Sequence, residues 1–253
     1  MANLYANLVF ICAILVAIAP GYKFDCKMTF EQLDECVEHA MFIGNRNAIV
    51  PTNEAEMDQH CNTIKDGISC ARDYASTCVT GFPQQVTGMV LTNVGQLMEK
   101  RCGTPKERAE FLENVKCFIP SAEKMKPLHD CFDKNIKIME LASQLNADDP
   151  HMAFVCCGHH LFKQCIVQNT AKICSSGHAD YWDDVFDEVA SEVIAFACGD
   201  FDTVNVCQNK MDPKYWSQLA TIDSATDPAV WHHSYKTPVK FMLDMIHKFH
   251  MDG

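Results

Sequence analysis

Apolar side chains recur along this chain three and four positions apart, the spacing of α-helices that bury one face. The first such stripe follows Thr29, a residue suited to a helix N-cap, and we expect its helix to end near Gly44. Strand-like alternation of apolar and polar residues is essentially absent, so the pattern predicts an all-α protein. The first stripe consists of Phe30, Leu33, Val37, Ala40 and Met41.

Capping residues and prolines mark the starts of further helices. One helix is expected from Asn53, which can form a cap together with Glu56, to about Cys78. The next helix, which begins after Gly81, should end at Gly103. The other starts combine a chain break or a capping residue with a proline: Gly81-Phe82-Pro83, Thr104-Pro105, Asp149-Pro150 and Thr237-Pro238.

Two later segments are amphipathic at helical spacing, and the residues between them, 211–235, are mixed in character. The last of these helices follows Thr237-Pro238 and is expected to pack on the second half of the chain, with binding to a partner or a membrane surface as the alternative. The first segment, residues 181–198, has an apolar face of Trp182, Val185, Phe186, Val189, Val193 and Ile194. The last helix has an apolar side of Val239, Met242, Leu243, Ile246 and Phe249.

The N-terminal segment indicates the compartment. Residues Leu8 to Ala19 form an uncharged apolar run of 12, which is too short to span a bilayer and fits the h-region of a secretory signal peptide. The small residues Ala19 and Gly21 predict cleavage after Gly21. We therefore expect residues 1–21 to be a signal peptide and the protein to be secreted and extracellular, without a membrane span in the remaining chain.

The chain has 15 cysteines, and cleavage of the signal peptide would remove Cys12 and leave an even number, 14. Such a number in a secreted chain is what complete pairing as disulfides requires. Twelve cysteines form two series, with gaps of 25, 9, 8, 24 and 15 residues and of 25, 9, 9, 24 and 9 residues. The first series is Cys36, Cys61, Cys70, Cys78, Cys102 and Cys117, and the second is Cys131, Cys156, Cys165, Cys174, Cys198 and Cys207.

The matching gaps predict two tandem, disulfide-linked helical repeats, offset by 95 or 96 residues. Six cysteines per repeat can close three internal bridges in 15 ways, and this choice stays open. The unmatched Cys26 and Cys157 are then expected to join the repeats. Cys61 and Cys70 are nine residues apart, on opposite faces of one helix, so they should reach different neighbouring helices.

Charge and composition exclude several classes of protein. The chain carries 33 acidic and 21 basic side chains, a net charge of -12, so a nucleic-acid backbone is not expected as a partner. With 48% hydrophobic and only 21% charged residues, the chain is not a disordered acidic tail. Its length after the predicted cleavage is sufficient for one large domain or two smaller ones.

The run Cys156-Cys157-Gly158-His159-His160 is the most suggestive of chemistry. A Cys-Cys-x-x-His sequence occurs in secreted phospholipases A2, whose catalytic histidine is followed by an aspartate that holds calcium. Here Leu161 follows His160, and no glycine-rich calcium loop precedes the run. We therefore interpret the run as scaffold.

Six histidines could suggest a zinc or copper site, but paired cysteines cannot be ligands and no His-Glu-x-x-His is present. We find no nucleophile–base arrangement either. The sequence therefore predicts no metal, no cofactor and no enzymatic activity. The histidines considered are His159, His160, His232, His233, His247 and His250.

Thirteen methionines are many for a chain of this length. Flexible thioethers suit irregular cores, and they also suit adaptable apolar pockets. Core packing is the first interpretation, and a cavity for a lipophilic ligand between helices is the second.

Residues 30–118 resemble the cysteine-rich, helical secreted proteins of unknown function found in spiders, mites and ticks. A more distant similarity runs to nematode cysteine-rich domains and insect haemolymph glycoproteins. This resemblance implies secretion and an all-α disulfide fold, and it implies no catalytic residue. It rests on Phe30-Glu31-Gln32-Leu33-Asp34-Glu35-Cys36, on Cys61 through Cys78, and on Arg101-Cys102 followed by Arg108-Ala109-Glu110-Phe111-Leu112.

We therefore expect a secreted, non-enzymatic binding or carrier protein whose partner is a small apolar ligand or an extracellular protein. One alternative is a structural or venom- or silk-associated component without a small ligand, and a remote one is an unrecognised hydrolase. The expected organisation is signal peptide 1–21, repeat 22–120, repeat 121–210 and a C-terminal extension with an amphipathic helix, 211–253.

Overall fold

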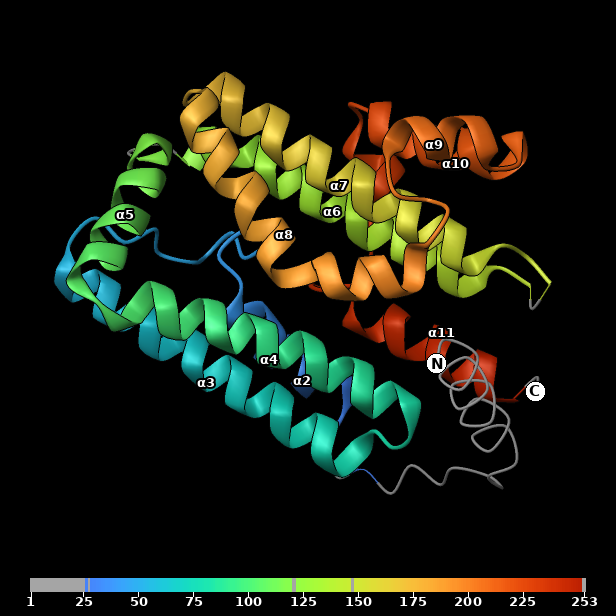
Figure 1. Ribbon diagram of the computed structural model, residues 1–253, viewed down its shortest axis with the longest axis horizontal. Coiled ribbons are helices and arrows are strands. Elements are labelled where there is room, and N and C mark those ends of the chain that lie inside the picture. Colours follow the sequence, from blue (N-terminus) through green and yellow to red (C-terminus); the bar gives the residue numbers. More distant parts are fainter. Residues whose placement is uncertain (1–25, 27, 120–121, 147, 252–253) are drawn as a thin grey trace, which may run out of the picture.

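The computed structural model describes residues 26, 28–119, 122–146 and 148–251, and this part of the chain contains helices and no strand (Figure 1). The all-α prediction is confirmed. The predicted signal peptide lies outside the described residues. The α-helices are α2 (Phe30–Ala40), α3 (Glu54–Cys78), α4 (Phe82–Gly103), α5 (Pro105–Val115), α6 (Ala122–Gln144), α7 (His151–Ile173), α8 (Ser176–Cys198), α9 (Val204–Lys210), α10 (Pro213–Ser224) and α11 (Val239–Met251); short 3₁₀ turns are η1 (Lys116–Phe118) and η2 (Pro228–Trp231).

The predicted helix starts are present, and at Thr29, Asn53 and Thr104 the expected caps form. The Thr29 hydroxyl accepts from the backbone of Gln32, whose side chain in turn accepts from the backbone of Thr29, a complete capping box for α2. Asn53 caps α3 by accepting from the Glu56 backbone N–H at 3.0 Å. One boundary differs: α2 ends at Ala40 and Gly44 lies in the loop beyond it.

The mixed segment 211–235 contains a helix that the pattern did not predict. α10 starts at Asp212-Pro213, where the Asp212 carboxylate accepts from the Lys214 backbone N–H at 2.8 Å. Its buried side chains are Tyr215, Leu219 and Ile222, at positions i, i+4 and i+7. This three-residue stripe is short, so the polar residues around it obscured the helical spacing.

The helices form two groups that pack face to face (Figure 1). In the N-terminal half, α2, α3 and α4 pack in chain order, and α5 with η1 follows. In the C-terminal half, α6, α7 and α8 do the same, and α9 and α10 pack on α7. The two halves meet where α4 packs against α8. No helix in the described ranges combines the length and the apolar character needed to cross a membrane.

Seven disulfide bonds join the fourteen described cysteines, and those pairs that helical geometry excluded are absent. Cys61 and Cys70 reach α4 and α2 respectively, as expected. Two pairs of bonds correspond between the halves at the offset of 95 or 96. The bonds are Cys26–Cys78, Cys36–Cys70, Cys61–Cys102, Cys117–Cys174, Cys131–Cys165, Cys156–Cys198 and Cys157–Cys207.

The expected bridge between Cys26 and Cys157 is wrong. Cys26 lies just before α2 and bonds to Cys78 at the end of α3, because the two helices are antiparallel. Cys157 bonds to Cys207 on α9, whereas its neighbour on α7 bonds to α8. Successive helical residues point about 100° apart, so adjacent cysteines on α7 reach two different partners.

The expectation of three internal bridges per repeat is also wrong, because Cys117 of the N-terminal half bonds to Cys174 of the C-terminal half. Cys117 lies in η1 after α5, and Cys174 follows the last residue of α7. Parity counts cysteines but carries no information about which helix ends meet, so the sequence could not identify this pair.

The loop after α2 depends on Gly44. This residue has φ of +103°, a backbone conformation that L side chains rarely adopt, and its Cα faces the ring of Phe132 on α6. Its backbone N–H donates to Nδ1 of His129 at 3.0 Å. Burial, together with the charge of Arg46, lowers the pKa of His129, consistent with a neutral ring that accepts this bond.

We expect Gly44→Ala to reduce the free energy of unfolding by about 3 kcal/mol, because the new Cβ adds left-handed strain and overlaps the Phe132 ring. Denaturant unfolding monitored by circular dichroism measures this. Gly88→Ala on α4 is the matched control, since its Cβ would meet no atom within 4 Å, and it should be neutral or slightly stabilising. Equal effects of the two substitutions would contradict this account.

The C-terminal helix packs on both halves rather than on the second alone. Phe241 and Met245 join the core of the C-terminal half, and Leu243 joins a cluster with α2 and α3. Met242, predicted on the apolar side, is 41% exposed. The side chains of Ile246 and Phe249 lie outside the described part. The segment before α11 is held by the buried Asp34 of α2, whose carboxylate accepts from the backbone N–H of Lys236 and of Thr237 and from the Thr237 hydroxyl.

Candidate functional site

An apolar cleft of about 220 Å³ lies where the two halves meet. The lining comes from α2, the loop after it, α3 and α4 in the N-terminal half, and from α6, α7 and α8 in the C-terminal half. Every lining side chain except two, His60 and Arg101, is apolar. The lining residues are Ala40, Met41, Phe42, Ile43, His60, Ile64, Val94, Leu97, Met98, Arg101, Phe132, Phe162, Trp182, Val185, Phe186 and Val189.

Packed aromatic rings form one end of the cleft. Phe42 lies 5.4 Å from the ring of Trp182 and 6.3 Å from the ring of Phe111, between centroids. His60 stacks on Phe111 at 5.2 Å. Phe111 is fully buried, and Trp182 is 4% exposed. The rings come from α3, α5, α8 and the loop after α2, so this end exists only in the folded chain.

Arg101 brings a buried cation to this apolar site. The residue is 7% exposed, and its guanidinium carbon lies 4.4 Å from the centroid of the Phe111 ring and 6.0 Å from that of Trp182. Burial lowers the pKa of Arg101, and the Tyr181 hydroxyl and Glu188 oppose this effect. The guanidinium therefore packs mainly against aromatic rings, which stabilise a cation but do not neutralise it.

His60 is neutral at ordinary pH. Burial lowers its pKa from 6.5 to about 4, and the charge of Arg101 acts in the same direction. Among the described residues, its Nε2 atom has no hydrogen-bond partner, and the same holds for Nε1 of Trp182. Buried polar atoms without partners are rare in folded proteins and call for an explanation. Here they belong to side chains that line one cleft.

Methionines occur both in the core and in the lining of the cleft, the two locations that the sequence suggested. Met41 and Met98 line the cleft. Several others, such as Met57 and Met139, are buried in the core clusters. Thioethers therefore fill the interior and also contribute adaptable surface to the cleft.

The run Cys156–His160 lies on α7 and packs against its neighbours. Both of its cysteines are in disulfides. His160 makes a 2.9 Å hydrogen bond with the carbonyl of Phe201, and the ring of His159 lies 6.4 Å from that of Phe186. Burial is the main cause that lowers the pKa of His159 to about 4. These contacts agree with the interpretation as scaffold.

The histidines considered as metal ligands are dispersed. His233 lies 3.4 Å from a carboxylate oxygen of Asp133, far along the chain from the α7 pair. The side chains of His247 and His250 are outside the described part. Within the remainder, no group of three or more histidine, cysteine, aspartate or glutamate residues is arranged to hold a metal ion.

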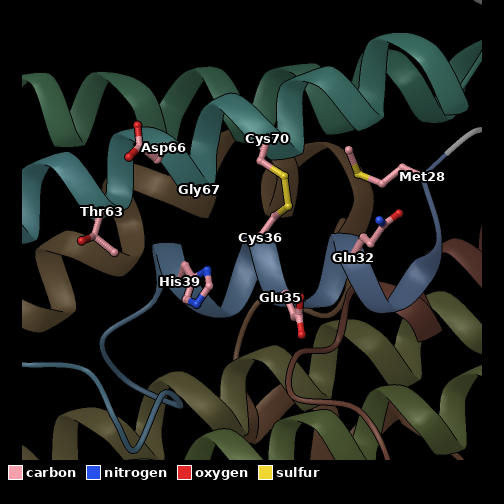
Figure 2. A pocket seen from close by; sticks show the side chains of 9 residues that line it. All are labelled: Met28, Gln32, Glu35, Cys36, His39, Thr63, Asp66, Gly67 and Cys70. Carbon is pink, nitrogen blue, oxygen red and sulfur yellow. A yellow bond between two sulfur atoms is a disulfide. The ribbon is translucent and has the colours of Figure 1, made fainter.

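A wider groove lies between α2 and α3, and it is open and polar at its rim (Figure 2). Its volume is about 770 Å³, and the Cys36–Cys70 disulfide crosses it. Gly67 permits this crossing, because a Cβ there would lie 2.7 Å from the Cys36 carbonyl oxygen. Glu35, His39 and Asp66 stand around the rim, but no lining side chain has a buried unpaired polar atom. The groove therefore offers less chemistry than the apolar cleft.

Sequence reasoning did not identify Arg101 as a site residue, although a signal for it existed. Val94, Leu97, Met98 and Arg101 occupy positions i, i+3, i+4 and i+7, so the arginine continues the buried stripe of α4. A charged residue at the end of an apolar stripe is a candidate for a buried functional group. His60 and Trp182 gave no comparable sign.

Comparisons with protein-family models, with curated proteins and with solved structures found no match to this chain.

Proposed function

We propose that this chain is a secreted, non-enzymatic binding protein that carries a small apolar ligand in the cleft between its halves. The observation that carries the proposal is the cleft itself, about 220 Å³ with an almost wholly apolar lining. An apolar cavity of about 150 Å³ is known to bind benzene, so this cleft suits a ligand somewhat larger than benzene. Convergent polar groups at one end, from Arg101, His60 and Trp182, fit the usual design of small-molecule sites.

Secretion is supported by the disulfides. All fourteen described cysteines are paired, a pattern typical of oxidising compartments. A signal peptide at residues 1–21 would deliver the chain to such a compartment.

We also propose that residues 22–120 and 121–210 are tandem repeats, with 211–253 as an extension. Two matched pairs of bonds support this: Cys36–Cys70 with Cys131–Cys165, and Cys61–Cys102 with Cys156–Cys198. We further propose that the chain is related to the secreted cysteine-rich arthropod proteins that residues 30–118 resemble.

A fluorescence titration tests the carrier function. The neutral apolar fluorophore 1-aminonaphthalene should bind the mature, disulfide-intact protein with a blue shift and saturation at one site. Val94→Phe should weaken this binding at least about ten-fold, because the larger ring occupies the cleft. Val230→Phe is the matched control: Val230 is 36% exposed on η2, away from the cleft, and its substitution should leave the affinity unchanged.

Native mass spectrometry of protein purified from its source is the second test of the carrier function. A bound lipophilic molecule of one defined mass would support the carrier. Failure of both the fluorophore and native spectrometry to reveal binding would favour a structural secretion component without a small ligand. Turnover of ester substrates, with or without calcium, would favour the hydrolase alternative.

A further inference from the structure

Within the described part of the chain, one complete edge of the Arg101 guanidinium has no partners. Its Nε and Nη2 atoms are both buried and lack a hydrogen bond. These two nitrogens point in the same direction on a planar guanidinium, and together they form the edge that holds the two oxygens of a carboxylate. A buried polar group in this state costs free energy unless a bound molecule satisfies it.

The described part of the chain supplies no counter-ion for this cation. The Tyr181 hydroxyl, which interacts favourably with Arg101 and shares a hydrogen bond with it, is neutral at pH 7, since burial raises its pKa further above 10.0. Glu188 acts on Arg101 only through its charge, without a hydrogen bond, and its side chain is 39% exposed and paired with Lys100 at 3.2 Å. A buried charge that lacks a partner is strongly destabilising. An anion that enters the cleft and pairs with Arg101 would remove this unfavourable free energy, which favours its binding.

A second donor lines the same cleft. The Nε1 atom of Trp182 can only donate a hydrogen bond, and no described residue offers it an acceptor. The guanidinium carbon lies 6.0 Å from the centroid of the Trp182 ring, so both donors belong to the same end of the cleft. Beyond them the lining is apolar, along Val94, Val185 and Val189.

We infer that the ligand is an anionic amphiphile, a medium-chain carboxylate whose head group binds Arg101 and Trp182 and whose chain fills the apolar part of the cleft. This inference rests on the proposed carrier function. A volume of about 220 Å³ limits the chain to about eight carbon atoms, given that about 150 Å³ accommodates benzene. Octanoate is therefore the probe.

Calorimetric titration of the disulfide-intact protein with octanoate, 1-octanol and octylammonium tests the inference without any substitution. Octanoate should bind at least about ten-fold more tightly than 1-octanol, and octylammonium should bind most weakly, because one charge-assisted hydrogen-bonded pair is worth at least that factor. If 1-octanol binds as tightly as octanoate, the head-group assignment is overturned and the carrier function stands. If none of the three binds and 1-aminonaphthalene also fails, both proposals fall.

Arg101→Met provides the matched test, since it removes the charge and keeps an unbranched apolar side chain. It should abolish the preference for octanoate while 1-octanol affinity changes less than about three-fold. Lys100→Met removes one charge from the adjacent, 58% exposed side chain and should preserve the preference. An unchanged octanoate affinity in Arg101→Met would overturn the inference.

A spectroscopic readout locates the head group even if Arg101→Met does not fold. The chain has three tryptophans, so the indole N–H signal of Trp182 is assigned by its loss in Trp182→Phe. Octanoate should shift this signal in the wild-type protein, and 1-octanol should shift it less. A Trp182 signal that stays in place at saturating octanoate would contradict the proposed head-group position.

Discussion

Lowering the pH from 7 to 4.5 is expected to reduce the free energy of unfolding by about 5 kcal/mol, chiefly through His60 and His159. Burial lowers the pKa of each histidine from 6.5 to about 4 in the folded protein. Each depressed pKa corresponds to about 2.5 kcal/mol over this pH interval.

The sign follows from proton binding. Below pH 6.5 the unfolded chain protonates these imidazoles, whereas the folded protein keeps them neutral until the pH approaches about 4. The unfolded state therefore binds more protons in this window, and stability falls as the pH falls. Above pH 6.5 both states hold neutral imidazoles, and this contribution to the pH dependence vanishes.

Urea unfolding at a series of pH values measures the effect. The double substitution His60→Gln and His159→Gln should flatten the profile between pH 6.5 and 4.5. His39→Gln is the matched control, because His39 is exposed at the rim of the α2–α3 groove, and its profile should follow that of the wild type. A steep acid transition that persists in the double variant would mean that other groups control it.

Removal of the Cys117–Cys174 bond is expected to reduce the free energy of unfolding by about 4 kcal/mol. The bond closes 57 residues, and cross-linking a loop of this length removes that much chain entropy from the unfolded state. It also holds the end of α5, near Phe111, against the start of α8, which carries Trp182. We therefore expect Cys117→Ala with Cys174→Ala to weaken 1-aminonaphthalene binding as well as stability.

The paired substitution Cys131→Ala with Cys165→Ala is the comparison, since that bond closes 34 residues inside the C-terminal half. It should cost a similar free energy of unfolding, yet leave binding closer to the wild type. Hydrogen exchange should show faster exchange along α8 in the first variant only. Equal loss of binding in both variants would show that general destabilisation, rather than the bond between the halves, controls the cleft.

Local patterns predicted the helices well where a cap was followed by a long stripe. Thr29, Asn53 and Thr104 all cap helices as expected, because a capping bond involves residues only a few positions apart. α10 was missed because its stripe has only three apolar residues. The end of α2 was misplaced because Gly44 serves the contact with Phe132 rather than a helix stop.

The sequence predicted the kind of site, an apolar cavity between helices, but not the residues that form it. Thirteen methionines and the helical stripes suggested an apolar cavity between helices, but they gave neither its position nor its polar end. Arg101, His60 and Trp182 come from α4, α3 and α8, and their proximity depends on how the two halves meet. No spacing along the chain encodes that contact.

By itself, the sequence determined the all-α class, most helix starts and an even number of cysteines free to pair after the predicted cleavage. These follow from interactions over a few residues and from counting. Only the tertiary structure decided that Cys26 joins Cys78 and that Cys117 joins Cys174. It alone also placed in an apolar cleft a cation, Arg101, that has no counter-ion among the described residues. Those features depend on which helix ends and faces meet, and packing of distant segments sets that arrangement.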